Sequence, residues 1–146
     1  MTDDQLREYC DAEFENIDAV EVELRSIVRP EKSEYSIAEL AAISTFIHNI
    51  YNGIENILKR VFRANQIKID DTPTWHKDLL KTASDIEIIP NDLYVTLSDY
   101  LSFRHFFVHS YSFRLKWEEL KPLVDGLGGM LNKFRSAINH YIEQHN

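Results

Sequence analysis

Apolar residues recur every three or four positions along most of the chain, the spacing that gives an α-helix one buried face. This pattern predicts five helices, over residues 5–28, 36–64 and 75–81, from 91 to between 111 and 113, and from 123 to the C-terminal end. No stretch of useful length alternates between apolar and polar residues, so no β-strand is expected. The sequence therefore predicts an all-α protein, a bundle of four to five helices that forms a single domain over residues 1–146.

Residues that commonly begin or end helices mark three of the predicted boundaries. Ser36 and Glu39 form a capping-box pattern, in which each side chain satisfies the backbone N–H of the other residue. Asn91 or Asp92 is the expected N-cap of the fourth helix. Pro122 is expected in a turn, with the last helix beginning directly after it.

The composition fits a single core and a reducing compartment. With 44% hydrophobic residues, a chain of 146 residues buries roughly two-thirds of its unfolded surface. Its one cysteine, Cys10, has no partner within the chain for a disulfide. No apolar run approaches the roughly 18 residues of a membrane span, and the first residues are acidic where a signal peptide is basic. We therefore expect a cytoplasmic protein that does not bind a membrane.

The net charge of −8 is unfavourable for a nucleic-acid partner, but its distribution changes that picture. Residues 1–24 hold nine acidic side chains and one basic side chain, which accounts for the whole excess. The other 122 residues carry fifteen acids and fifteen bases. Four of these bases cluster near the end of the second predicted helix: Lys59, Arg60, Arg63 and Lys68. The overall charge therefore does not exclude RNA as a ligand.

Several catalytic patterns are missing from the chain. It has no glycine-rich phosphate loop, no G-x-S-x-G sequence, no paired cysteines for zinc and no Glu-x-x-His pair of the di-iron type. These absences weigh against metal and nucleotide-hydrolase chemistry, and we expect neither a metal nor a cofactor.

A narrow polar stripe runs along the second predicted helix. His48, Asn52, Glu55 and Lys59 lie at offsets of 4, 7 and 11 and span only about 60° of the helix circumference. Taken alone, the stripe favours a solvent-exposed face on which Glu55 and Lys59 form an i,i+4 ion pair. The alternative is a functional surface.

The fourth predicted helix carries Arg104, His105 and His109 among aromatic residues, where an arginine is costly unless it meets a partner or a cleft. His105 and His109 share one face, whereas Arg104 and His109 point about 140° apart on an ideal helix. A shared site therefore needs the arginine side chain to swing, the helix to end near His109, or a second subunit. The alternative is two buried histidines and an arginine that extends to solvent.

Arg104-x4-His109 resembles the R-x4-6-H signature of HEPN-domain ribonucleases, and with Tyr111 it is similar to the R-x4-H-x-Y form of HepT-like toxins. The residue after the motif arginine is commonly polar in the family and often Asn. Here it is His105, whose role the resemblance leaves open.

Two further motifs occur in the order that the resemblance requires. Glu55-x3-Lys59-Arg60 is similar to the E-x3-K-R motif of HEPN proteins, and residues 75–80 resemble the W-H-x-x-L-L stretch of HepT-like chains. The three motifs span residues 55–111. Together they are far more specific than R-x4-H alone.

The resemblance implies a metal-independent endoribonuclease toxin, in which the RNA 2′-hydroxyl attacks phosphorus and leaves a 2′,3′-cyclic phosphate. It implies that His109 moves a proton as general base or acid and that Arg104 stabilises the phosphate charge. Lys59 and Arg60 would position RNA, and Glu55 would orient one of them or His109.

The resemblance also implies partners. HepT-like toxins are typically homodimers that bring both R-x4-H motifs to one cleft, and they pair with a minimal nucleotidyltransferase antitoxin. By motif match, Tyr111 is the residue that would accept AMP from that antitoxin. The alternatives are a non-catalytic HEPN-like module that binds RNA, nucleotide or protein, and a plain interaction bundle that uses its acidic first helix.

Overall fold

The computed structural model describes residues 2–111 and 114–145. Within them the chain forms six helices: α1 (Asp3–Ile27), α2 (Ile37–Ala64), α3 (Trp75–Asp85), α4 (Asn91–His109), α5 (Trp117–Asp125) and α6 (Leu127–Gln144). The described residues contain no strand, and the predicted all-α bundle is confirmed. None of these helices is both long enough and apolar enough to cross a membrane.

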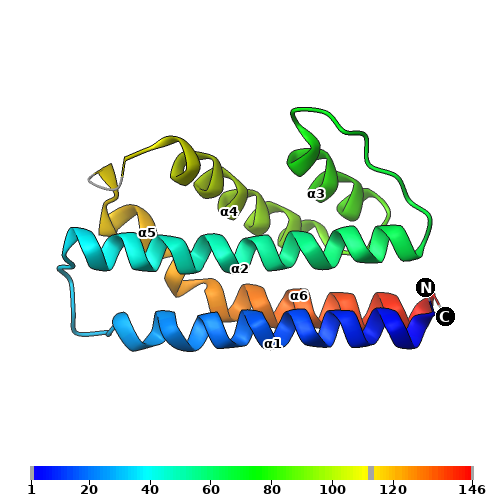
Figure 1. The fold of residues 1–146 in the computed structure, drawn as a ribbon, viewed down its shortest axis with the longest axis horizontal. Coiled ribbons are helices and arrows are strands. Elements are labelled where there is room, and N and C mark those ends of the chain that lie inside the picture. The colour runs from blue at the N-terminus through cyan, green and yellow to red at the C-terminus, as the bar shows by residue number, and fades with distance from the viewer. Residues whose placement is uncertain (1, 112–113, 146) are drawn as a thin grey trace.

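Helix α2 runs through the middle of the bundle, with α1 along one side and α3 and α4 on the other (Figure 1). Apolar side chains surround much of α2 and are buried along its whole length, as its broad hydrophobic face predicts. Gly53 permits close packing against α1, because a Cβ atom there would lie 2.8 Å from Cγ1 of Ile17. The two halves of the bundle are thus built around one central helix.

The start of α2 confirms one predicted cap, and the start of α4 corrects another. Ser36 Oγ accepts a hydrogen bond from the Glu39 backbone N–H at 3.1 Å, and the Glu39 side chain accepts one from the Ser36 N–H at 2.8 Å. At α4, however, the N-cap is Pro90, whose extended backbone leads into Asn91 with no side-chain cap. Asp92 lies one residue further in, and its carboxylate pairs with a lysine of α6 instead.

The end of α4 and the final helices differ from the prediction. Helix α4 ends at His109, two residues before the shortest predicted end, and residues 112 and 113 lie outside the described residues. Pro122 is not in a turn but inside α5. The chain bends instead at Gly126, whose N–H bonds the Pro122 carbonyl at 3.0 Å and which separates α5 from α6. Glycine is a poorer helix former than any residue except proline, so this junction divides the predicted last helix into two.

Helices α2 and α3 end in the same local structure. Gln66 and Glu87 have φ angles of 58° and 64°, in the left-handed region that favours glycine. The backbone N–H groups of Ile67 and Ile88, one residue later, each bond the carbonyl five residues earlier at 2.8 Å. This arrangement is the Schellman motif, built here without glycine.

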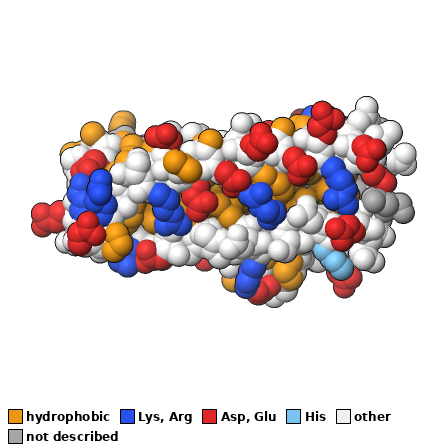
Figure 2. All heavy atoms as spheres, turned by 90° about the horizontal axis from the view of Figure 1, so that it is seen from below, with side chains coloured by type: hydrophobic (Ala, Val, Ile, Leu, Met, Phe, Trp, Pro, Cys, Tyr) orange, Lys and Arg blue, Asp and Glu red, His pale blue; other side chains and the backbone are white. Residues whose placement is uncertain are grey.

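The acidic residues of α1 are partly balanced by neighbouring bases. Asp18 pairs with Arg135 of α6 at 2.7 Å, and Glu21 pairs with Arg25 at 3.3 Å. Figure 2 shows the side of the molecule formed by α1 and α6, where acidic and basic side chains are interspersed. The excess negative charge therefore lies on the side of α2 that faces away from α3 and α4 (Figure 1).

Candidate functional site

The polar stripe of α2 faces the interior of the bundle. Glu55 is only 3% exposed, and His48 and Asn52 are half-buried, because α3 and α4 cover this side of α2. Lys59, at the end of the stripe, is exposed. The expectation of a solvent-exposed face is therefore wrong for all but the last residue of the stripe, and the stripe has protein partners on the neighbouring helices.

The partner of Glu55 is His76 of α3. His76 Nδ1 lies 2.8 Å from Oε2 and 2.9 Å from Oε1 of the Glu55 carboxylate. The predicted ion pair between Glu55 and Lys59 is replaced by this contact, while Lys59 Nζ lies 5.1 Å from the centre of the Trp75 ring. A buried carboxylate is costly unless it is paired, and His76 provides the hydrogen-bond donor. Sequence reasoning included His76 only as part of the W-H-x-x-L-L stretch and gave it no role.

Arg104 of α4 is held by the middle of the same stripe. Its Nε donates a hydrogen bond of 3.3 Å to Asn52 Oδ1, and Asn52 Nδ2 lies 3.1 Å from His48 Nε2. Since arginine only donates, Asn52 must present its oxygen to Arg104 and its NH₂ to His48, which makes His48 a neutral acceptor. Burial, and next the charge of Arg104, lower the pKa of His48, in agreement with a neutral ring, and Glu55 opposes this shift.

Other buried polar atoms lie on this side of α2. Nδ1 of His48 and the hydroxyl of Tyr51 have no hydrogen-bond partner among the described residues. Burial, and next the Glu55 carboxylate, raise the pKa of Tyr51, so its hydroxyl stays protonated. The His48 ring also packs against Phe107 of α4, with ring centres 5.2 Å apart. The interior of the bundle is thus polar where α2 meets α3 and α4.

A cavity of about 490 Å³ opens between α3 and α4 beside Arg104. Its charged and titratable lining consists of His76, Lys77, Tyr94, Arg104 and His105, and no described Asp or Glu side chain lines it. Serine and threonine side chains supply further polar groups at its wall. The positive charges of Lys77 and Arg104, together with these hydrogen-bond donors, suit an anion such as a phosphate.

The motif histidines are exposed and lie along the outer face of α4. The rings of His105 and His109 are 4.7 Å apart, which confirms that they share a face. They are not the buried pair that the alternative interpretation expected. His105 lines the cavity, whereas His109 is the last residue of α4 and does not line it. Arg104 turns toward α2, so one chain alone does not join Arg104 and His109 in one cavity.

Tyr111 lies beyond the end of α4 and is 71% exposed. The fourth helix was predicted to reach at least residue 111, and α4 ends two residues earlier. Most of the Tyr111 side chain is therefore exposed, at the same end of α4 as His109.

The basic cluster at the end of α2 divides between two sides of the helix. Lys59, Arg63 and Lys68 line a cavity of about 890 Å³ next to Trp75 and two aspartates. Arg60 instead stacks on the Tyr9 ring of α1, with its guanidinium carbon 4.0 Å from the ring centre. The structure therefore brings Lys59 to the side of α3 and does not bring Arg60 there.

The C-terminal half of α4 is apolar but incompletely covered. Phe103, Phe106 and Phe107 are only partly buried, and Val108 is 47% exposed. The fully buried residues of α4 all belong to its first ten positions. A helix that is apolar on most sides is normally buried, whereas the described residues cover this end of α4 only in part.

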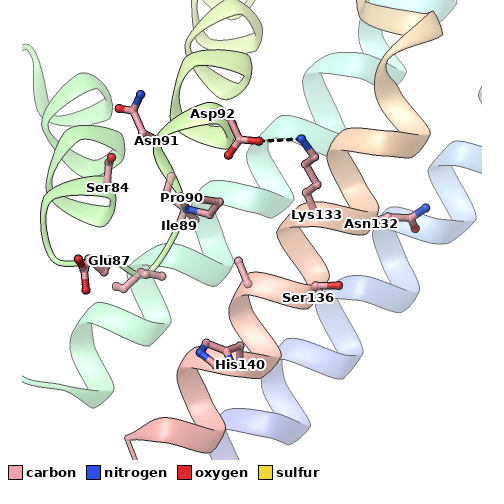
Figure 3. Close-up of a pocket in the computed structure, with 12 residues that line it drawn as sticks. Ser84, Glu87, Ile89, Pro90, Asn91, Asp92, Asn132, Lys133, Ser136 and His140 are labelled. Atoms are coloured by element: carbon pink, nitrogen blue, oxygen red, sulfur yellow. Dashed lines mark hydrogen bonds and ion pairs between the residues drawn. The ribbon is translucent and has the colours of Figure 1, made fainter.

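A third cavity, of about 860 Å³, lies between the α3–α4 connection and α6 (Figure 3). Asp92 and Lys133 pair at 2.7 Å across it, and Glu87 adds a second acidic side chain to its lining. None of the predicted site residues lines it. Among the described residues, no group of three or more His, Cys, Asp or Glu side chains is placed to hold a metal ion. Size alone therefore does not identify the site, and the smaller cavity beside Arg104 is the stronger candidate.

Comparison with known families gives one match. A family model described as "HepT-like protein" matches residues 42–145, a range that begins within α2 and includes every residue of the candidate site. No curated protein and no solved structure matches the chain.

Proposed function

Since the chain belongs to the HepT-like family of HEPN proteins, we propose that it is a metal-independent endoribonuclease toxin that acts in the cytoplasm. Its substrate is RNA, one phosphodiester of which lies in the cavity beside Arg104. The observation that carries the proposal is the cavity itself, in which Arg104, His76, Lys77 and His105 meet without an acidic side chain. Such a lining favours a polyanion even though the whole protein is acidic.

Arg104 is the residue that stabilises charge on the phosphate. Its guanidinium stays charged at every relevant pH and can bond two phosphate oxygens through its planar fork. The Asn52 contact uses Nε, which leaves the two terminal NH₂ groups for the ligand. These groups stabilise the negative charge that accumulates on phosphorus-bound oxygens during attack by the 2′-hydroxyl.

His109 is the proposed general base, and a second copy of the chain completes the site. The imidazole removes the 2′-hydroxyl proton as the 2′-oxygen bonds to phosphorus, and the product is a 2′,3′-cyclic phosphate. A homodimer formed through the incompletely covered end of α4 would bury Val108 and the partly buried phenylalanines. It would also place His109 near the cavity of the partner subunit.

Tyr111 is the proposed control point. Its 71% exposure supports the approach of a minimal nucleotidyltransferase antitoxin, which would transfer AMP to the Tyr111 hydroxyl. Added phosphate charge and an adenosine at the end of α4 would repel and obstruct RNA, which gives a physical basis for neutralisation. Lys59 supports RNA binding on the neighbouring surface, whereas the stacking of Arg60 on Tyr9 of α1 favours a structural role.

The direct test compares wild type, Arg104→Ala and His109→Ala, each incubated with RNA and a chelator. The wild type is expected to cleave RNA to products ending in cyclic phosphate, and both variants are expected to lose about 10²-fold or more of the rate. Arg29→Ala and His140→Ala are matched controls, because both residues lie away from the cavity. Intact RNA with every protein, together with Arg104-dependent RNA binding, would favour the non-catalytic HEPN-like module instead.

A further inference from the structure

Cleavage by a 2′-hydroxyl requires two proton transfers. One group takes the proton from the 2′-oxygen, and another gives a proton to the 5′-oxygen that leaves phosphorus. The R-x4-H motif contributes one histidine, His109, and that residue does not line the cavity that holds Arg104. The histidine that lines this cavity from α3 is His76.

The geometry fixes which nitrogen of His76 is available. Nδ1 lies within 2.9 Å of both oxygens of Glu55, so it carries a hydrogen and donates to the carboxylate. No described residue forms a hydrogen bond with Nε2. The ring is also held flat against Trp75, with centres 3.6 Å apart and an angle of 29° between the planes. His76 is thus a fixed imidazole whose second nitrogen remains for a ligand.

Burial makes this pair unlike a surface ion pair. The Glu55 side chain is 4% exposed and the His76 side chain 21%, so the carboxylate is inside while the ring reaches the cavity. A carboxylate that accepts from one imidazole nitrogen fixes the orientation of the ring. The other charged or titratable groups that line the same space are Lys77 on α3 and Tyr94, Arg104 and His105 on α4.

We propose that His76 is a catalytic residue, the general acid of the cavity, and that Glu55 is the positioning residue that holds it; this inference rests on the proposed ribonuclease function. The 2′-oxygen forms its bond to phosphorus and releases its proton to His109. The bond from phosphorus to the 5′-oxygen breaks, and the 5′-oxygen takes the proton from Nε2 of His76. The products are a 2′,3′-cyclic phosphate and a 5′-hydroxyl. His109 has gained the proton of the 2′-hydroxyl and His76 has lost one to the 5′-oxygen, and proton exchange with solvent restores both histidines.

The test changes the atom that leaves phosphorus. Two RNAs of the same sequence are compared, one with the ordinary 5′-oxygen and one with sulfur in that bridging position, since a thiolate leaves without being protonated. The His76→Asn variant keeps an N–H donor for Glu55 and removes Nε2. It is expected to cleave the oxygen substrate about 10²- to 10⁴-fold more slowly than wild type, yet the sulfur substrate within about tenfold.

Matched variants separate this role from others. His140→Asn, in the cavity of Figure 3, is expected to cleave both substrates like wild type. His109→Asn and Arg104→Ala are expected to be slow with both, because neither defect concerns the leaving group. Glu55→Gln is expected to cleave the oxygen substrate more slowly than wild type but faster than His76→Asn does, since the amide oxygen still accepts from Nδ1 but no longer carries charge.

Folding is controlled independently. The double variant Glu55→Gln/His76→Asn has no buried carboxylate left without a partner and is expected to retain helical circular dichroism and the rescue by sulfur. The role of His76 would be overturned if His76→Asn cleaved the oxygen substrate as fast as wild type. It would also be overturned if a folded double variant cleaved both substrates more slowly by the same factor. A wild type that cleaves neither substrate would overturn the ribonuclease function itself, and His76 as general acid with it.

Discussion

Nε of Arg104 on α4 donates to Oδ1 of Asn52 on α2, across 52 positions of sequence. The same Asn52 amide reaches His48 on its other side, so one side chain orients the arginine and a neutral histidine together. The arginine of the R-x4-H motif is therefore aimed by a residue that lies outside all three sequence motifs.

The Asn52 contact predicts a catalytic effect of removing it. Asn52→Ala is expected to lower kcat/KM for RNA about tenfold, because a lost hydrogen bond to a charged group is worth about 1.5 kcal/mol or more and Arg104 becomes less ordered. Steady-state cleavage of a fluorogenic RNA measures this. Asn49→Ala, an exposed asparagine on the same helix, is the control. Equal rates for the two variants would contradict the positioning role of Asn52.

The buried pair of Glu55 and His76 predicts a stability effect. His76→Leu leaves the Glu55 carboxylate buried without its partner and is expected to lower the free energy of unfolding by about 3 kcal/mol or more. Glu55→Gln/His76→Leu, which removes the charge as well, is expected to recover at least half of that loss. Urea unfolding followed by circular dichroism gives both values. A single variant as stable as wild type would show that the pair is not desolvated in solution.

The ends of α2 and α3 predict stabilising substitutions. Gln66→Gly and Glu87→Gly relieve a left-handed backbone conformation and are each expected to raise the free energy of unfolding by up to about 1 kcal/mol. Glu15→Gly, at an exposed position inside α1, is the opposite control and is expected to lower it by about 1 kcal/mol. Destabilisation by all three glycines would mean that residues 66 and 87 do not hold positive φ angles.

Cys10 predicts a pH effect. Burial, and next the nearby Asp11, raise the pKa of the Cys10 thiol from 9.0 to about 11. Between these two pH values the folded protein keeps a thiol proton that the unfolded chain releases. The contribution of the buried thiol to the free energy of unfolding is therefore complete below pH 9 and is lost as the pH rises to about 11. The stability difference between wild type and Cys10→Ala is expected to shrink by about 1 to 2 kcal/mol over that range. A constant difference would contradict the burial of the thiol.

The uncovered end of α4 predicts the dimer. Val108→Asp is expected to convert a dimer into a monomer in analytical ultracentrifugation and to abolish RNA cleavage, because the charge would be buried at the interface. Val22→Asp, at a residue 66% exposed on α1, is the matched control and is expected to remain dimeric and active. Cleavage by a strictly monomeric wild type would refute the shared site.

Hydrophobic periodicity predicted the helices of this chain because it records which face is buried. The capping box at Ser36 was correct because its hydrogen bonds are local. The prediction of a turn at Pro122 was wrong, because the position of a proline does not show that the helix is interrupted at Gly126, four residues later.

The site was only partly predictable for a related reason. Spacing placed Glu55 and Asn52 on one stripe, but whether that stripe meets water depends on helices that follow much later in the chain. The partner of Glu55 is 21 positions away, and no local pattern connects the two residues. The family motif identified Arg104 and His109 as site residues. The helical repeat predicted that their side chains point in different directions, and the different surroundings of the two side chains confirm this.

The stacking of Trp75 on His76 gives the protein a built-in optical reporter. The indole contacts the imidazole on one side, and Lys59 lies over its ring, so its emission responds to changes in either group. The other tryptophan, Trp117, packs on Tyr35 far from this cavity. A Trp117→Phe protein would therefore carry a single fluorophore beside the site, and occupancy of the cavity could be followed in real time without a label.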